Sequence, residues 1–202
     1  MGKAEAVIDS DFLQGILNNT SADFFKQLME ELNVIPLVHS YVADVELQYC
    51  NEAKKLIESG YIRKVKYEEY LPTEMDRFLY NEEVWELLDL FDENELPPLK
   101  YRDIFRKDFR YTEHSIGEIM SELMAKNMKI PLFASNDEGA KKIANAKFNS
   151  ARYVLEVKNV AELLSEIGVR ENKLVWRDIK AVLRESRWSK QKKELWSLWN
   201  EN

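Results

Sequence analysis

The sequence predicts an α/β protein, a three-layer α/β/α sandwich on a central, mainly parallel sheet of about five strands. Three observations lead to this prediction. Short continuous apolar runs, typical of strands buried on both faces of a parallel sheet, recur along the chain. Segments with apolar residues at helical spacing separate them. Several runs end on an acidic residue, and ligands of open α/β sheets bind at that carboxyl edge.

The composition is that of a globular protein. The 202 residues are 45% hydrophobic and 32% charged, which excludes a largely disordered chain and favours one core with elaborations. No apolar run approaches a membrane span, and residues 1–5 lack the apolar stretch of a signal peptide. The single cysteine, Cys50, agrees with a reducing compartment. We therefore expect a cytoplasmic protein without membrane contact.

The charge is distributed unevenly along the chain. The net charge of −7 argues at first against a polyanionic substrate. Residues 67–98, however, contain eleven acidic residues and one basic residue, Arg77. The rest of the chain is therefore net positive and remains compatible with a nucleic acid.

The first expected strand covers residues 6–8 and ends on Asp9-Ser10-Asp11. A helical pattern follows from Phe12 to Leu17. Ser21 or Thr20 then serves as the expected N-cap of a second helix. The apolar face of that helix carries Phe24, Phe25, Leu28, Met29 and Leu32.

The second expected strand covers residues 34–38. A helix is expected from residue 41 to about residue 59, with Gly60 as its C-terminal cap. Residues 61–67 alternate apolar and basic side chains, which is typical of a half-exposed third strand. The candidates for the buried side of the helix are Val42, Val45, Tyr49 and Leu56.

Residues 67–111 are expected to form a helical insertion or lid. Its acidic part is helical by pattern and stops at Pro97-Pro98, and a basic part follows from Lys100 to Arg110. If the acidic part lies across the binding groove, it should repel a polyanion; a solvated elaboration away from the site is the alternative. The expected apolar face carries Phe78, Leu79, Val84, Trp85, Leu87, Leu88 and Phe91.

The α/β pattern returns at residue 115. A helix with Ile116, Ile119, Met120 and Leu123 on its apolar face precedes a strand over residues 130–134. A helix over 138–146, a strand over 153–157 and a helix closed by Gly168 complete a domain of residues 1–168. Residues 169–202 form a C-terminal helical extension of two helices, with Trp176, Trp188, Trp196 and Trp199.

Four acids fall where such a sheet would bind a ligand. Asp9 and Asp137 follow strands, and Glu46 and Glu118 lie near helix starts. Carboxylates that converge at one edge repel each other unless a cation lies between them. Oxygen ligands without thiolates or paired histidines favour a hard ion, Mg²⁺ or Mn²⁺.

The chain resembles the PIN-domain nucleases over residues 5–168. The resemblance rests on four motifs in the family's order: residues 7–13, residues 41–47, Gly117-Glu118 and residues 132–137. It implies the α/β/α fold and metal-dependent endonucleolytic cleavage of RNA. The insertion at about 67–111 and the tail after Gly168 are additions to the family's minimal pattern. The implied acidic quartet is Asp9, Glu46, Glu118 and Asp137, with Ser135 steadying the last acid and Asp11 either adding a ligand or capping the first helix.

Alternatives stay open at this point. Asp9 and Asp137 would otherwise be helix N-caps, with Glu46 and Glu118 solvated, and the protein a non-catalytic RNA-binding or protein-interaction module. Glu122 is expected to face solvent. A homodimer or a partner protein is left open. His39 and His114 are given no role, and the C-terminal tryptophans are expected to form core or an oligomer contact, with an RNA-facing role as the minority interpretation.

Overall fold

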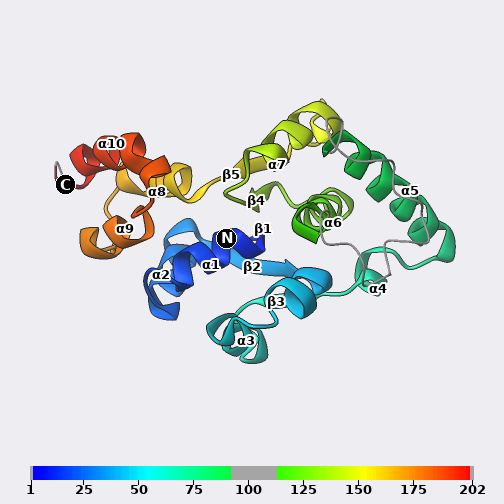
Figure 1. Cartoon of the computed structure of the whole chain (residues 1–202), viewed down its shortest axis with the longest axis horizontal. Helices are drawn as coiled ribbons and strands as arrows, with labels where there is room; N and C mark the ends of the chain where they lie inside the picture. The colour runs from blue at the N-terminus through cyan, green and yellow to red at the C-terminus, as the bar shows by residue number, and fades with distance from the viewer. Residues whose placement is uncertain (1, 92–112, 201–202) are drawn as a thin grey trace.

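The computed structural model describes residues 2–91 and 113–200 and contains a five-stranded, all-parallel sheet in the order β3-β2-β1-β4-β5 (Figure 1). The expected fold class is therefore confirmed, although most strands are shorter than the apolar runs that predict them. The strands are β1 (Ala4–Ile8), β2 (Val34–His39), β3 (Arg63–Val65), β4 (Leu132–Ala134) and β5 (Glu156–Lys158).

Helices cover both faces of the sheet and make three layers. Alternate residues of each strand point to opposite faces, so Ile8 packs into one core and Val7 into the other. The first core includes α1 (Ser10–Leu17), α2 (Ala22–Leu32), α3 (Asn51–Glu58) and α8 (Val160–Gly168). The second includes α5 (Glu74–Phe91), α6 (Glu113–Met128), α7 (Glu138–Ile143) and the π-helical turn η3 (Ala144–Phe148).

The order of the strands creates a switch point between β1 and β4. The chain proceeds from β1 through β2 to β3 on one side and then returns to place β4 on the other side of β1. The backbone N–H of Asp9 donates to the carbonyl of Ala134 at 3.0 Å, which ties the ends of the two strands together. Residues that follow β1 and β4 therefore meet at one edge, where open α/β sheets bind ligands.

Two helix ends expected from capping residues in the sequence are present in the structure. Ser21 accepts a hydrogen bond from the backbone N–H of Phe24 at 3.2 Å and so caps α2. Gly60 follows α3 with a φ of +75°, the left-handed conformation that glycine adopts without strain. Both expected helix boundaries are confirmed.

The single helix expected over residues 41–59 is wrong. The chain instead forms a π-helical turn, η1 (Val42–Glu46), and resumes as α3 only at Asn51. Val42 is buried as expected, but Val45 is 41% exposed and Tyr49 is 87% exposed. The wider turn and the break shift the helical phase, so residues spaced for one continuous helix fall on different sides.

The described part of the insertion consists of α4 (Tyr67–Tyr70) and α5, so the third strand ends before Tyr67. Val84 and Leu87 are buried as expected, together with Tyr80, whereas Phe78 and Leu79 are mostly exposed. The buried stripe follows helical spacing from Tyr80, which turns Phe78 and Leu79 away from it. The stop at Pro97-Pro98, the basic segment Lys100 to Arg110, and the side chains of Trp85, Leu88, Phe91 and His114 lie outside the described residues.

The tail folds as expected into α9 (Trp176–Val182) and α10 (Ser189–Asn200), joined by a 3-10 turn, η4 (Ser186–Trp188). It packs at the end of the molecule that α8 forms (Figure 1). Gly168 permits a close approach here, because a Cβ at this position would overlap the indole of Trp199. Nowhere in ranges 2–91 and 113–200 does a helix have the length and apolar character needed to cross a membrane.

Candidate functional site

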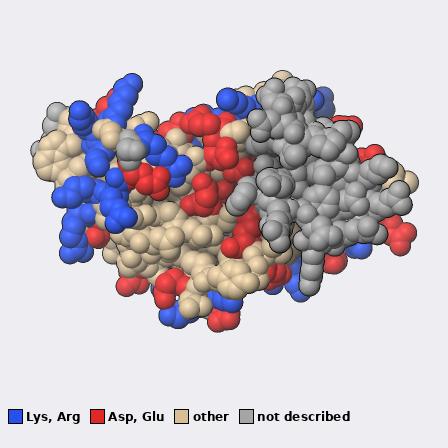
Figure 2. All heavy atoms as spheres, in the orientation of Figure 1, with Lys and Arg blue, Asp and Glu red and all other residues tan. Residues whose placement is uncertain are grey.

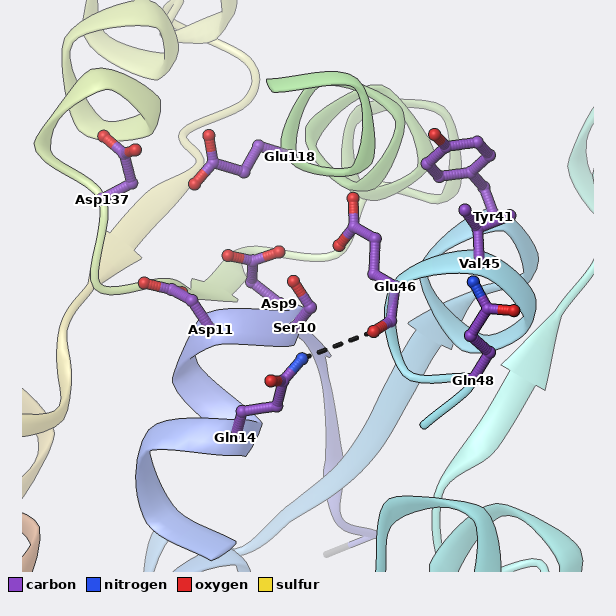
Figure 3. A pocket seen from close by; sticks show the side chains of 10 residues that line it. All are labelled: Asp9, Ser10, Asp11, Gln14, Tyr41, Val45, Glu46, Gln48, Glu118 and Asp137. Atoms are coloured by element: carbon purple, nitrogen blue, oxygen red, sulfur yellow. Dashed lines mark hydrogen bonds between the residues drawn. The ribbon is translucent and has the colours of Figure 1, made fainter. Parts of the chain in front are cut away.

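A cavity of about 560 Å³ opens at the carboxyl edge of the sheet, at the switch point (Figure 3). All five acids predicted from the sequence line it, and no lysine, arginine or histidine is among the described residues that do so. The sequence did not predict its remaining walls. The lining residues are Asp9, Ser10, Asp11, Gln14, Tyr41, Val45, Glu46, Gln48, Glu118 and Asp137.

Asp9 lies at the floor of this acidic pocket, directly after β1. Its side chain is 1% exposed, and its Oδ2 accepts a hydrogen bond from the Ser135 hydroxyl at 3.2 Å. Its Oδ1 is buried and accepts no hydrogen bond from any described residue. A buried carboxylate oxygen without a donor is costly, so Asp9 presents an unsatisfied acceptor. Asp9 occupies the N-cap position of α1, as the alternative interpretation expects, but its side chain accepts no capping hydrogen bond within the described part of the chain.

Ser135 connects the two strand-end acids. Its hydroxyl donates to Asp9, and its oxygen accepts the backbone N–H of Asp137 at 3.1 Å. Asp137 also caps α7, because its Oδ1 accepts the backbone N–H of Gly139. The capping interpretation of Asp137 is therefore confirmed, and the same residue lines the acidic pocket.

Glu46 reaches the acidic pocket from η1 and lies against the backbone of α6. A Cβ on Gly117 would overlap the Glu46 carboxylate, so this contact requires glycine at position 117. The carbonyl of Glu46 accepts a hydrogen bond from Gln14 Nε2 at 3.5 Å (Figure 3). Both residues of the motif Gly117-Glu118 thus contribute to the site. Gly117 leaves room for the Glu46 carboxylate, and Glu118 adds its own carboxyl group.

Glu118 extends from α6 towards Asp137 and lies in the second turn of the helix, not at its start (Figure 3). Its side chain is buried, with 6% of the residue exposed, so the solvated alternative is wrong. Burial, followed by the negative charges of Asp137, Asp11 and Glu46, raises the pKa of Glu118 to about 9.

Asp11 lies in the first turn of α1 and faces the same cavity (Figure 3). Its charge contributes to the raised pKa of Asp9, for which burial is the largest cause, and Glu118 and Glu46 add to the effect. Every described group that shifts the pKa of Asp9 raises it, so the protein alone favours a proton on this carboxyl group.

Glu122 was expected to face solvent, and this prediction is wrong. The residue is fully buried one helical turn after Glu118, and neither of its carboxylate oxygens has a hydrogen-bond partner among the described residues. Burial, followed by the charges of Glu118 and Asp137, raises the pKa of Glu122 well above its usual range. Its helix, α6, is covered by the sheet on one side and by α5 on another, so its polar positions are buried as well.

His39 takes part in a buried hydrogen-bond network beside the acidic pocket. Its Nδ1 accepts the backbone N–H of Tyr41 at 3.0 Å, so its Nε2 carries the proton and bonds the Tyr70 hydroxyl at 3.0 Å. Tyr70 donates to Tyr80, and Tyr80 donates to the carbonyl of Met120. Burial lowers the pKa of His39 to about 4, so the ring is neutral at pH 7. His39 is therefore a packing histidine, as expected.

The carboxyl groups line the acidic pocket without forming a ready coordination sphere. In ranges 2–91 and 113–200, no three side chains of His, Cys, Asp or Glu are grouped so that they could hold a metal ion. The donor chemistry nevertheless suits a hard cation, since five of the lining residues, Asp9 among them, carry carboxyl groups. The buried, unsatisfied Oδ1 of Asp9 also fits such a ligand.

Comparisons with known proteins give no relative: the sequence matches no protein-family model, no curated protein and no solved structure. The resemblance to PIN-domain nucleases therefore stays a prediction based on the four sequence motifs.

Proposed function

We propose that the protein is a Mg²⁺- or Mn²⁺-dependent endoribonuclease that hydrolyses RNA phosphodiester bonds. One observation carries the proposal: five carboxyl groups from four separate chain segments line one pocket at the switch point of the sheet. Such a cluster is unfavourable unless its charge is neutralised, and divalent cations do this in sites that bind phosphates.

In this proposal Asp9 and Asp137 hold the ion, and Glu46 and Glu118 complete or orient its surroundings, with Asp11 beside them. The ion would supply a Lewis acid and an activated water. To bind the ion, the carboxylate side chains would have to rotate towards one another, because the described groups are not arranged as a coordination sphere.

Other residues of the chain would prepare the site. Ser135 fixes the spacing of Asp9 and Asp137 through its two hydrogen bonds. Gln14, Gln48 and Tyr41 add uncharged polar groups to the cavity wall, and these can donate hydrogen bonds to phosphate oxygens without adding negative charge.

A second candidate function is a non-catalytic RNA-binding or protein-interaction module. The absence of a metal-binding group of three side chains among the described residues favours it, as does the use of Asp137 as a helix cap. In that case the raised pKa values of Asp9 and Glu118 would favour their protonated forms, and these side chains would serve packing.

Cleavage of labelled single-stranded RNA separates the two functions. The wild type should cleave with Mn²⁺ and stop when a chelator is added, and Asp9→Asn should lose about a hundredfold or more of the activity. Asp23→Asn is the matched control, because Asp23 is exposed on α2 and outside the acidic pocket. Mn²⁺ at about 100 times its dissociation constant should also stabilise the wild type by about 2.7 kcal/mol, but not Asp9→Asn.

Equal or absent cleavage in all samples, together with an unfolding midpoint that Mn²⁺ leaves unchanged, would favour the non-catalytic module. A midpoint that rises without cleavage would show a metal site with another activity.

A further inference from the structure

The C-terminal helices carry a charge opposite to that of the acidic pocket. Residues 170–200 contain nine basic and four acidic residues. Figure 2 shows lysine and arginine side chains gathered over the end of the molecule where α9 and α10 lie, and acidic side chains beside them on the same face. A polyanion that approaches the acidic pocket would need attraction from elsewhere, since none of the residues in ranges 2–91 and 113–200 that line it is basic.

Several of these basic residues are not neutralised locally. Lys180, Arg184 and Lys193 are exposed and form no ion pair with any residue in the described ranges. By contrast, Arg177 pairs with Asp178 and Arg187 pairs with Glu185. Lys180 lies on α9, Lys193 lies on α10, and Arg184 lies in the connection that follows α9, so both helices contribute positive charge to this end of the molecule.

A large aromatic side chain lies within this surface. Trp196 is 48% exposed, and its ring centroid lies 4.8 Å from that of Trp176, with the planes tilted by 53°. Lys193 precedes Trp196 by three residues on α10, and Lys180 follows Trp176 by four on α9. Residues at these spacings are neighbours on a helix surface, so each lysine lies on the same side of its helix as one tryptophan of the pair.

We propose that Trp196, Lys180 and Lys193 form a binding surface for single-stranded nucleic acid. A base would stack on the exposed indole, and the lysines would contact the phosphates on either side of it. An exposed aromatic ring on helices that carry uncompensated cations suits this ligand, because every nucleotide pairs a flat base with a negative charge. The inference goes beyond the proposed endoribonuclease activity, since it requires neither a metal ion nor cleavage.

The test measures binding of the full chain to a labelled single-stranded oligonucleotide, with chelator present so that no cleavage occurs. Lys180→Gln/Lys193→Gln should weaken binding and lower the dependence of log K on log salt by roughly 1.4, about 0.7 for each lost phosphate contact. Trp196→Ala should weaken binding by about fivefold or more through lost stacking. The lysine variant keeps the tryptophan packing intact, so its result does not depend on correct folding of Trp196→Ala.

Lys54→Gln/Lys147→Gln is the matched control. Both lysines are exposed on other elements and form no ion pair with the described residues, so the change in net charge is the same. The control should bind like the wild type.

Two results would overturn the proposal. If Lys180→Gln/Lys193→Gln and the control Lys54→Gln/Lys147→Gln lose the same affinity, binding depends only on the net charge of the protein. If polyglutamate binds as tightly as the oligonucleotide and depends equally on Lys180 and Lys193, the surface serves an acidic protein partner. Because the chelator removes cleavage from the assay, failure of the proposed nuclease activity would leave this result unaffected.

Discussion

The two faces of the sheet are built differently. The face covered by α1, α2 and α8 buries apolar side chains such as Phe12 and Phe25. The face covered by α6 also buries Glu118, Ser121 and Glu122. The first face can supply stability, whereas buried carboxyl groups on the second cost free energy unless they are neutralised.

The second face is itself divided. On its β2 side, the hydrogen bonds from Tyr70 to Tyr80 and from Tyr80 to Met120 satisfy the buried hydroxyl groups. On its β4 side, Asp9 Oδ1 and both oxygens of Glu122 lack partners among the described residues. Within ranges 2–91 and 113–200, Ser121 Oγ on α6 lacks a partner as well, as do Gln191 Oε1 and Trp199 Nε1 in the tail. The unsatisfied carboxylate oxygens of Asp9 and Glu122 indicate a place where stability has been given up for a site.

The largest expected effect on stability comes from a substitution in the core between the sheet and helices α1, α2 and α8. Phe25→Ala should lower the free energy of unfolding by about 3–5 kcal/mol, because it removes a fully buried ring and leaves a cavity. Tyr80→Phe on the opposite face should cost only about 1–3 kcal/mol, through the lost hydrogen bond to Met120. Urea unfolding at one pH compares them, and equal losses would contradict the difference between the faces.

A change at Glu122 should sharpen the comparison through pH. In the unfolded protein, Glu122 releases its proton near its usual pKa of 4.5. In the folded protein its pKa is raised, so it retains the proton to higher pH. Between these values the unfolded state binds fewer protons, so stability falls as the pH rises above about 4.5. Glu122→Gln should flatten this fall and add roughly 1–3 kcal/mol at pH 8.

The control for this measurement is Glu82→Gln, because Glu82 is exposed on α5. It should change the free energy of unfolding by less than about 0.5 kcal/mol at any pH. A wild-type stability that does not vary between pH 5 and pH 8 would show that Glu122 is neutralised in another way.

The smallest expected change in stability is that of Gly15→Ala, which we compare with Gly117→Ala. A Cβ on Gly15 would meet only Asn136 Nδ2 at 3.5 Å, an ordinary contact, so Gly15→Ala should stabilise α1 by about 0.5–1 kcal/mol. Gly117→Ala should displace Glu46 and lower cleavage by roughly tenfold to a hundredfold. Thermal unfolding and the RNA assay measure both variants, and retained activity in Gly117→Ala would exclude a role for the position of Glu46.

The sequence predicts best what the ends of strands determine. Asp9 and Asp137 follow buried strands, and parallel strands bring their carboxyl ends to one edge, so their meeting could be inferred without coordinates. The acid cluster is therefore a consequence of topology as much as of local pattern.

What the sequence does not predict depends on packing between distant segments. Glu122 was expected in solvent because the helical pattern shows one apolar stripe, whereas α5 covers a further side of α6. The exposed positions of Val45 and Tyr49 follow from the π-helical turn, which periodicity cannot reveal. A glycine inside a helix next to Glu118 was the available signal for the contact between Gly117 and Glu46.

The hydrogen bond from Ser135 to Asp9 spans 126 residues of sequence, and this separation has a consequence for folding. The pairing of β1 with β2 joins segments about thirty residues apart and can form early, whereas β4 can join β1 only after the whole insertion has been made. A chain synthesised from its N-terminus therefore holds Asp9 and Glu46 before Asp137 exists. The acidic pocket is therefore completed only after the segments that pair β1 with β2 have been made.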